Sequence, residues 1–230
     1  PNIIGVTPSH QFPLGMTMGL SRRLALLEYA ASNDVWILED DYDSEFRYSG
    51  EPIAALQGLD NGGRVIYTGS FSKVLFPALR LGYLVAPPDL IPPLTRMRAV
   101  TDRCPPRIIQ MVLCDFITEG YFYEHIREMR TLYKARRRIL IDALNEEFGD
   151  FFEVIRTDAG LHVVAQLPAG VDDQAISETL DEADLVAPPL SHFSDGEIDR
   201  GALLLGYASV TESEIRDGVK SMARVLSPYL

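Results

Sequence analysis

Residues 69–73 read Gly-Ser-Phe-Ser-Lys, and residues 79–83 read Leu-Arg-Leu-Gly-Tyr. The apolar, β-rich run at 64–68 that precedes them predicts a buried strand, and residues 79–86 predict a second one. Pro77 lies between the two runs and prevents a regular helix there. A short turn between two buried strands is therefore expected to carry an amine, two hydroxyls and a guanidinium.

The cations of this turn are Lys73 and Arg80, and its hydroxyls belong to Ser70 and Ser72. Basic side chains at strand ends often reach solvent along their aliphatic stems, and taken alone the two cations fit that interpretation equally well. Lys and Arg at the edge of apolar runs also suit an anionic ligand, which accepts charge-assisted hydrogen bonds.

A second polar cluster changes the balance between these interpretations. The strand predicted at 35–38 continues directly into Glu-Asp-Asp-Tyr-Asp at 39–43. In open α/β sheets, ligands bind beyond the carboxyl ends of the strands. We therefore expect Asp40 and Tyr42 to converge with the basic turn on one ligand.

These motifs resemble the cofactor site of fold-type-I pyridoxal-phosphate enzymes, the aspartate aminotransferase superfamily. The resemblance rests on Asp40 and Tyr42, on Ser-Phe-Ser-Lys at 70–73, and on Arg80. It implies an α/β fold and pyridoxal 5′-phosphate as the cofactor.

Three longer stretches narrow the resemblance to the MocR group. They are Thr-Pro-Ser-His-Gln-Phe-Pro-Leu-Gly at 7–15, Glu-Asp-Asp-Tyr-Asp-Ser-Glu-Phe-Arg-Tyr at 39–48, and Phe-Pro-Ala-Leu-Arg-Leu-Gly-Tyr at 76–83. MocR proteins are bacterial regulators of the GntR superfamily that fuse a DNA-binding winged helix to an aminotransferase-like domain. The resemblance runs from one end of the chain to the other.

The resemblance also implies a domain organisation. Residues 1–148 would form a three-layer α/β/α large domain of the pyridoxal-phosphate-dependent transferase type, incomplete at its N-terminus and including the interdomain helices. Residues 149–230 would form a small C-terminal α+β domain. Because the family's phosphate-binding loop, its ring-stacking aromatic residue and the winged helix would all precede residue 1, we expect a fragment of a longer regulator.

The catalytic roles implied by the resemblance fall on three residues. Lys73 would hold the cofactor as a Schiff base, Asp40 would pair with the pyridine nitrogen, and Tyr42 would donate a hydrogen bond to the phenolic oxygen of the ring. Asp41 is a weaker alternative for the pyridine nitrogen. Asp40 could instead be an acid in a turn at the end of the strand, and the ring of Tyr42 could instead fill a gap at the strand end by packing.

The remaining cofactor contacts would grip the phosphate. Arg80 can bind two phosphate oxygens at once, with Ser70 and Ser72 as hydroxyl donors. The resemblance also brings His10 and Gln11 close to the ring, although local hydrogen bonds within their turn are an equally good interpretation.

One departure from the family concerns the substrate carboxylate. In aminotransferases an arginine near the C-terminus usually binds this group, and Leu204 occupies the matching position here. The departure favours a sensory domain that reports the level of cofactor or amino compound to a DNA-binding domain. A working aminotransferase of an amino acid or amine is the alternative, and a cofactor-free remnant that serves only dimer contacts is a third possibility.

Composition restricts the partners. The 230-residue chain is 47% hydrophobic, so it can bury a substantial core, and its net charge of −12 argues against direct binding of DNA. No apolar run reaches the roughly 20 residues of a membrane span. Cys104 and Cys114 suit a reduced cytoplasmic protein, and the four histidines are scattered without metal-ligand spacing. We expect a cytoplasmic homodimer that contacts DNA only through an absent winged helix.

Local signals predict three further features. Ser21 is expected to cap the helix that precedes the strand at 35–38. Residues 185–187 suggest a short strand. Thr-Glu-Ser-Glu at 211–214 has the pattern of a capping box and is expected to open the last helix.

Overall fold

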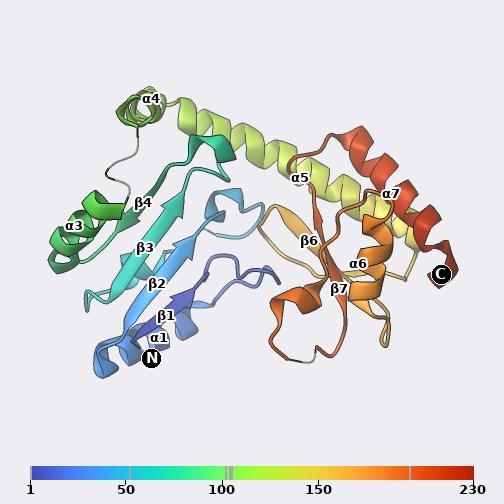
Figure 1. Ribbon diagram of the computed structural model, residues 1–230, viewed down its shortest axis with the longest axis horizontal. Coiled ribbons are helices and arrows are strands. Elements are labelled where there is room, and N and C mark those ends of the chain that lie inside the picture. The colour runs from blue at the N-terminus through green and yellow to red at the C-terminus, as the bar shows by residue number, and fades with distance from the viewer. Residues whose placement is uncertain (1, 52, 102, 104–105, 197) are drawn as a thin grey trace. The chain divides into compact units, whose positions relative to one another are not determined.

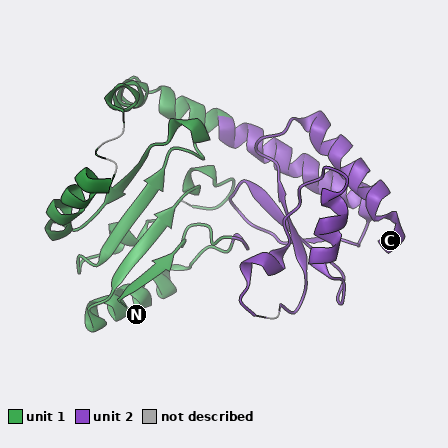
Figure 2. Ribbon diagram, in the orientation of Figure 1, with its two compact units in different colours: residues 1–12, 16–128 green, residues 13–15, 129–230 purple. Residues whose placement is uncertain are grey.

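The computed structural model describes residues 2–51, 53–101, 103, 106–196 and 198–230. The chain divides into two compact units, one of residues 1–12 and 16–128 and the other of residues 13–15 and 129–230 (Figure 2). The long helix α5 (Tyr121–Phe148) contributes to both units. The domain boundary expected after residue 148 stays a prediction.

The first unit contains a four-stranded sheet in the order β1-β2-β3-β4 (Figure 1). Strands β1 (Ile3–Val6), β2 (Trp36–Asp41) and β3 (Val65–Ser70) are parallel, and β4 (Gly82–Val85) is antiparallel to β3. Parallel neighbours require a crossover connection. Helix α1 provides it between β1 and β2, and the α/β class predicted from the sequence is confirmed.

The helices of this unit are α1 (Leu20–Asn33), α2 (Leu56–Leu59), α3 (Ile91–Thr101), α4 (Arg107–Thr118) and the beginning of α5. Short 3₁₀ helices occur at Ser44–Phe46, Pro77–Leu79, Pro88–Leu90, Leu190–Phe193 and Ser227–Tyr229 in the two units. No helix within the described residues is long and apolar enough to cross a membrane.

One face of the sheet forms the core of the first unit. Ile37 on β2 and Val65 on β3 are buried in one cluster with Ala30 of α1 and Leu56 of α2. Because side chains alternate along a strand, Glu39 and Asp41 share the covered face of β2 with Ile37, while Leu38 and Asp40 point to the opposite, exposed face.

A buried ion pair lies on the covered face. The side chains of Arg23 and Glu39 are both fully buried, and Nη1 of Arg23 is 4.0 Å from Oε1 of Glu39. The guanidinium of Arg23 donates to the backbone carbonyls of Pro8, Met18 and Ala54 at 2.7, 2.8 and 2.9 Å. Arg23 thereby fixes both ends of the loop between β1 and α1.

Glu39 ties the same pair to α2. Its two carboxylate oxygens accept from the backbone N–H groups of Leu56 and Gln57 at 2.8 and 2.9 Å. Burial raises the pKa of Glu39, and the two N–H donors and the charge of Arg23 oppose that shift. Burial likewise lowers the pKa of Arg23, and the carboxylate of Glu39 counteracts it. Each charge is thus held in the interior by the other and by backbone dipoles.

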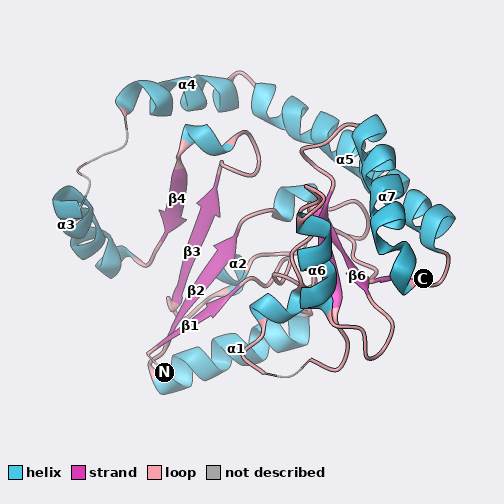
Figure 3. Ribbon diagram, turned by 45° about the vertical axis from the view of Figure 1, so that its right-hand side comes forward, coloured by secondary structure: helices cyan, strands magenta, loops and turns pink. Residues whose placement is uncertain are grey.

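The second unit is an α+β arrangement, as predicted. Its antiparallel sheet has the order β5 (Glu153–Val154), β6 (His162–Gln166) and β7 (Ala202–Gly206). Helices α6 (Asp173–Asp181) and α7 (Glu212–Leu226) pack against each other, and α6 contacts β7. Figure 3 shows both helices beside β6 of this sheet.

The capping box at the start of the last helix is confirmed. The N–H of Glu214 donates to Oγ1 of Thr211, and the carboxylate of Glu214 accepts from the N–H of Thr211. The cap predicted at Ser21 is wrong, because α1 begins at Leu20 and the carbonyl of Gly19 accepts its first N–H groups.

The short strand predicted at 185–187 is also wrong. This segment has no strand structure, and the backbone pairs with β7 two residues later, where Pro189 bridges Leu203 and the carbonyl of Pro188 accepts from the N–H of Leu204. Proline cannot donate to a ladder, so the contact remains an isolated bridge. Of the two cysteines, Cys114 is exposed and free, and Cys104 lies outside the described residues.

Gly201, just before β7, lies where a side chain has no room. A Cβ at this position would be 2.9 Å from Cβ of Asp173 and 3.1 Å from the carbonyl oxygen of Val171. Asp173 is buried and accepts from the N–H groups of Ser191 and Ala202, so it cannot move without losing them. We expect Gly201→Ala to lower the free energy of unfolding by about 1–3 kcal/mol in urea denaturation.

Gly206, at the other end of β7, provides the matched control. Nothing lies within 4 Å of a Cβ added there, so Gly206→Ala should change the stability by no more than about 1 kcal/mol. Equal losses in the two variants would contradict the steric argument.

The buried ion pair gives a second stability prediction. Arg23→Met leaves the Glu39 carboxylate buried without its counter-charge, and we expect a loss of about 3–5 kcal/mol in the free energy of unfolding. The double variant with Glu39→Gln removes the orphaned charge and keeps an oxygen that can accept from the N–H groups of α2, so it should be more stable than Arg23→Met alone. A double variant less stable than the single one would show that Glu39 does not depend on Arg23.

Candidate functional site

The sheet topology brings the predicted site residues to one edge. Asp40 near the end of β2 pairs with Thr68 of β3, so the carboxyl ends of these parallel strands lie side by side. Ser70 at the end of β3 pairs with Gly82 at the start of the antiparallel β4. Arg80, two residues before β4, therefore returns to the edge at which β2 and β3 end.

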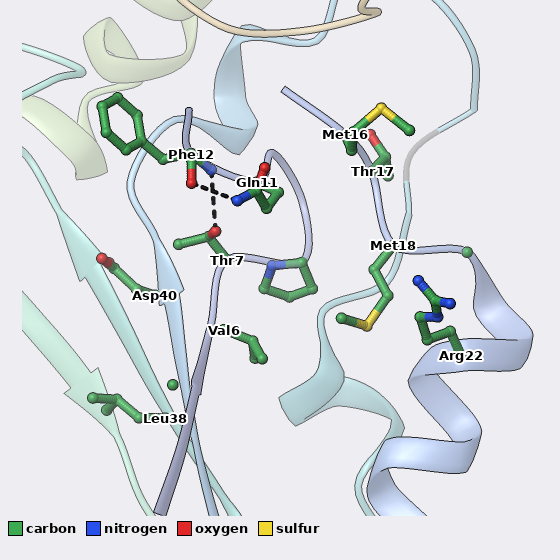
Figure 4. A pocket seen from close by; sticks show the side chains of 13 residues that line it. Val6, Thr7, Gln11, Phe12, Met16, Thr17, Met18, Arg22, Leu38 and Asp40 are labelled. Atoms are coloured by element: carbon green, nitrogen blue, oxygen red, sulfur yellow. Dashed lines mark hydrogen bonds between the residues drawn. The ribbon is translucent and has the colours of Figure 1, made fainter. Parts of the chain in front are cut away.

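Asp40 lies on the exposed face of β2. Its Oδ1 is 3.4 Å from Oγ1 of Thr68, a weak hydrogen bond. Its side chain lines a cavity of about 740 Å³ (Figure 4), whose other walls come mainly from β1 and the loop that follows it, with Leu38 of β2 and Arg22 of α1. This volume is within the range of small-molecule sites. Of the six predicted site residues, Asp40 alone is among those that line this cavity.

Asp41 has a different environment on the covered face. Its carboxylate accepts from the hydroxyls of Tyr67 at 2.8 Å and Ser44 at 2.7 Å, and from the N–H of Ser44 at 3.2 Å. Burial, and then the hydrogen bond to Asp41, raise the pKa of Tyr67. Asp41 is thus engaged in a buried network, and Asp40 is the carboxylate that β2 presents on its open face.

The turn after β3 carries Lys73. The N–H of Ser72 donates to Oγ of Ser70 at 3.2 Å, and the N–H of Phe71 donates to the carbonyl of Leu81 at 3.1 Å. These bonds tie the turn to β3 and to the segment that precedes β4. Lys73 itself is exposed, and its side chain makes no hydrogen bond or ion pair with another residue in the described ranges.

Arg80 follows the 3₁₀ helix at Pro77–Leu79. The second predicted strand begins at Gly82 instead of residue 79 because the chain first makes this turn, and the prediction that it is buried is wrong, since all four residues of β4 are exposed. Arg80 has a φ of 50° and a ψ of 34°, in the left-handed region. This conformation costs a non-glycine residue about 1–2 kcal/mol. Within the part of the chain that the structure describes, the exposed guanidinium has no hydrogen-bond or ion-pair partner.

Tyr42 is held by a buried histidine. Its hydroxyl donates to the carbonyl oxygen of His10 at 3.0 Å, and Nδ1 of His10 lies 3.0 Å from the same hydroxyl oxygen. Oδ2 of Asp43 is 2.8 Å from Nδ1, and the His10 and Asp43 side chains are 1% and 2% exposed. Burial, followed by the charges of Asp43 and Asp40, raises the pKa of Tyr42, so the phenol keeps its proton at neutral pH.

The sequence pattern did not identify Asp43 as a partner of this group. His10 and Tyr42 are 32 residues apart, and no local spacing signals a contact over that distance. Gln11, which was expected either near the ring or in local turn bonds, donates to the adjacent carbonyl of Phe12 at 2.6 Å (Figure 4).

Comparison with known proteins gives the family. The family described as "Aminotransferase class I and II" matches residues 6–222. The probable rhizopine catabolism regulatory protein MocR of Rhizobium meliloti is 40% identical over 223 residues, which are 96% of this chain and 45% of that protein. The chain spans about half the length of the first curated relatives that it matches.

Solved aminotransferases have the same fold. The kynurenine aminotransferase of Pyrococcus horikoshii, in complex with PMP, is 33% identical with a TM-score of 0.88, over 100% of this chain and 57% of that one. The α-aminoadipate aminotransferase LysN of Thermus thermophilus, complexed with N-(5′-phosphopyridoxyl)-L-leucine, is 28% identical with a TM-score of 0.89, over 99% of this chain and 59% of that one.

These comparisons confirm the fold-type-I class and the resemblance to MocR-type regulators that the sequence predicted. They also confirm pyridoxal phosphate as the cofactor of the family. The match extends over nearly the whole chain and includes both sets of motifs at the sheet edge. The chain belongs to the aminotransferase class I and II family.

Proposed function

We propose that this chain is the pyridoxal-phosphate-binding, aminotransferase-like sensory domain of a MocR-type transcriptional regulator, with Lys73 as the point of covalent attachment. One observation carries the proposal. The sheet topology gathers a carboxylate, a phenol, an amine and a guanidinium at one edge, and the two cations have no partner there among the described residues.

The donor set fits the chemical groups of the cofactor. Its aldehyde requires an amine, which Lys73 offers in exposed form. Its phosphate requires cationic and hydroxyl donors. Ser70 ends β3, Ser72 lies in the turn that follows, and Arg80 lies just before β4. When bound, pyridoxal phosphate supplies an electron sink for the amino compound attached to it.

The two remaining residues would act on the ring. Asp40 is the acceptor on the open face of β2 and would hold a hydrogen on the pyridine nitrogen. Tyr42 keeps its proton at neutral pH, and its hydroxyl would donate a hydrogen bond to the phenolic oxygen of the cofactor. Asp41 is fully engaged with Tyr67 and Ser44, which favours Asp40 for the nitrogen.

Leu204 favours sensing over turnover. It is 7% exposed in β7 and pairs with Val164, so an apolar buried side chain stands where the family pattern has an arginine for the substrate carboxylate. The relative at 40% identity is a regulator by its name. Similarity to solved aminotransferases supports the alternative, a working enzyme, which sustained turnover of an amino donor with a keto acid would establish.

The proposal extends to partners. The effector would be a small amino compound or the cofactor itself, and the assembly a cytoplasmic homodimer. DNA would be contacted by a winged helix outside this chain, since the net charge here is −12 and a phosphate backbone repels acidic surfaces.

Absorbance spectroscopy tests the attachment point. The purified protein mixed with pyridoxal phosphate should develop the absorbance band of a lysine-bound cofactor, and Lys73→Ala should abolish that band because no amine remains at the turn. Lys134→Ala, on α5, is the matched control and should leave the band unchanged. A band that persists in Lys73→Ala, or no band in the wild type, would overturn the proposal.

Arg80 allows phosphate binding to be separated from stability. Arg80→Gly removes the guanidinium but also relieves the left-handed backbone, so the free energy of unfolding should stay within about 1 kcal/mol of the wild type. The affinity for pyridoxal phosphate should fall by about tenfold or more, as expected for a lost charge-assisted hydrogen bond.

Asp184→Gly is the control for that variant. Asp184 has a φ of 60° and belongs to the second unit, so its replacement makes the same backbone change without touching the turn. Its affinity for the cofactor should equal that of the wild type. An equal loss of affinity in both variants would show that the backbone, and not the guanidinium, determines binding.

A further inference from the structure

The buried group of His10, Tyr42 and Asp43 determines where its hydrogens lie. A carboxylate oxygen can only accept, and Oδ2 of Asp43 lies 2.8 Å from Nδ1 of His10. Nδ1 must therefore carry a hydrogen, because two bare acceptors at this separation would repel each other. Of the two oxygens near this N–H, the hydroxyl oxygen of Tyr42, 3.0 Å from Nδ1, has hydrogen-bond geometry and accepts it, while Oδ2 of Asp43 makes no hydrogen bond within the described residues and acts on the imidazole by its charge.

The hydrogen of the Tyr42 hydroxyl follows from this assignment. Since Nδ1–H occupies one lone pair of the phenolic oxygen, the O–H is directed to the carbonyl oxygen of His10, also at 3.0 Å. One residue thus holds Tyr42 twice, by its ring and by its backbone. Both contacts lie in an interior where the His10 and Asp43 side chains are almost fully buried, and there such bonds are stronger than in water.

We propose that His10, whose Nδ1–H is favoured by the nearby carboxylate of Asp43, is a positioning residue for the Tyr42 phenol. Its Nδ1–H fixes the phenolic oxygen, and its backbone carbonyl accepts the phenolic O–H until a ligand replaces it as the acceptor. The role rests on the proposed function, in which Tyr42 donates to the phenolic oxygen of pyridoxal phosphate. His10 touches Tyr42 and acts on the cofactor only through it.

The arrangement lets Tyr42 change partners without moving. A hydroxyl hydrogen rotates about its C–O bond, so the hydrogen can turn from the His10 carbonyl to a ligand while Nδ1–H keeps the oxygen in place. Donation from Nδ1 also polarises the phenol and makes it a stronger donor. The charged groups that face Tyr42 are the carboxylates of Asp43, Asp40 and Asp41, and all three favour the protonated phenol.

The first test follows the bound cofactor as a function of pH. A donor to the phenolic oxygen of the cofactor stabilises its ionised form, so loss of that donor raises the pH midpoint of the absorbance change. We expect Tyr42→Phe and His10→Leu each to raise the midpoint, by about half a unit to one unit. The double variant should shift no further than Tyr42→Phe alone, because His10 acts through the phenol.

His10→Asn is the conservative variant. Its side-chain amide presents an N–H at the position of Nδ1, and its backbone carbonyl is unchanged, so it should restore most of the wild-type midpoint. Thermal melting of each variant checks that it is folded. A shift in His10→Leu that persists in full in the Tyr42→Phe background, or an equal shift in His10→Leu and His10→Asn, would overturn the positioning role.

A second readout needs no cofactor. In the cofactor-free protein, the ¹³Cζ resonance of Tyr42 reports the hydrogen bonds of its hydroxyl. This resonance should move in His10→Leu and in Asp43→Leu and should return toward its wild-type position in His10→Asn. If the wild type shows no cofactor band, the proposed function fails, and this resonance still decides the role of His10. A resonance that does not respond to His10→Leu would refute that role.

Discussion

The buried charge of Arg23 constrains the loop and the strand on which the rest of the first unit's site depends. An arginine with no exposed surface must find acceptors inside the protein, and it finds them in the carbonyls of Pro8, Met18 and Ala54 and in Glu39. Two of these carbonyls are the two ends of one loop. The need to satisfy a guanidinium therefore helps to set the geometry of that loop, together with the backbone bond from the N–H of Met18 to the carbonyl of Pro8 and the loop's own side-chain bonds.

The loop held in this way is the one that carries His10, and the strand that carries Glu39 also carries Asp40. Because side chains alternate between the two faces of β2, its three adjacent acids have different environments. Glu39 and Asp41 accept hydrogen bonds on the covered face, while Asp40 lies on the open face beside the cavity. A register shift of one residue would bury Asp40 and expose both structural acids. The ion pair that stabilises the unit thus also specifies which carboxylate is available for a ligand.

Sequence patterns predicted what depends on neighbouring residues. The strands that became β2 and β3 and the capping box of α7 all follow from local signals. A signal for the ion pair was also present, because Arg23 recurs with Leu27 and Ala30 at helical spacing and Glu39 shares a strand face with Ile37. A local pattern does not predict which residues become partners. His10 lies next to Asp43, and Asp41 accepts from Tyr67, because the folded sheet brings these distant residues together.

The same distinction bears on function. The basic turn indicates an anionic ligand, and the resemblance of the motifs to the pyridoxal-phosphate enzymes identifies its class, whatever the downstream role. Whether binding leads to turnover depends on a group for the substrate carboxylate, and Leu204 is buried and apolar. In the proposed sensing role, ligand binding would have to change a hydrogen bond of the protein, and the bond from the Tyr42 hydroxyl to the carbonyl of His10 is one that a ligand acceptor would replace.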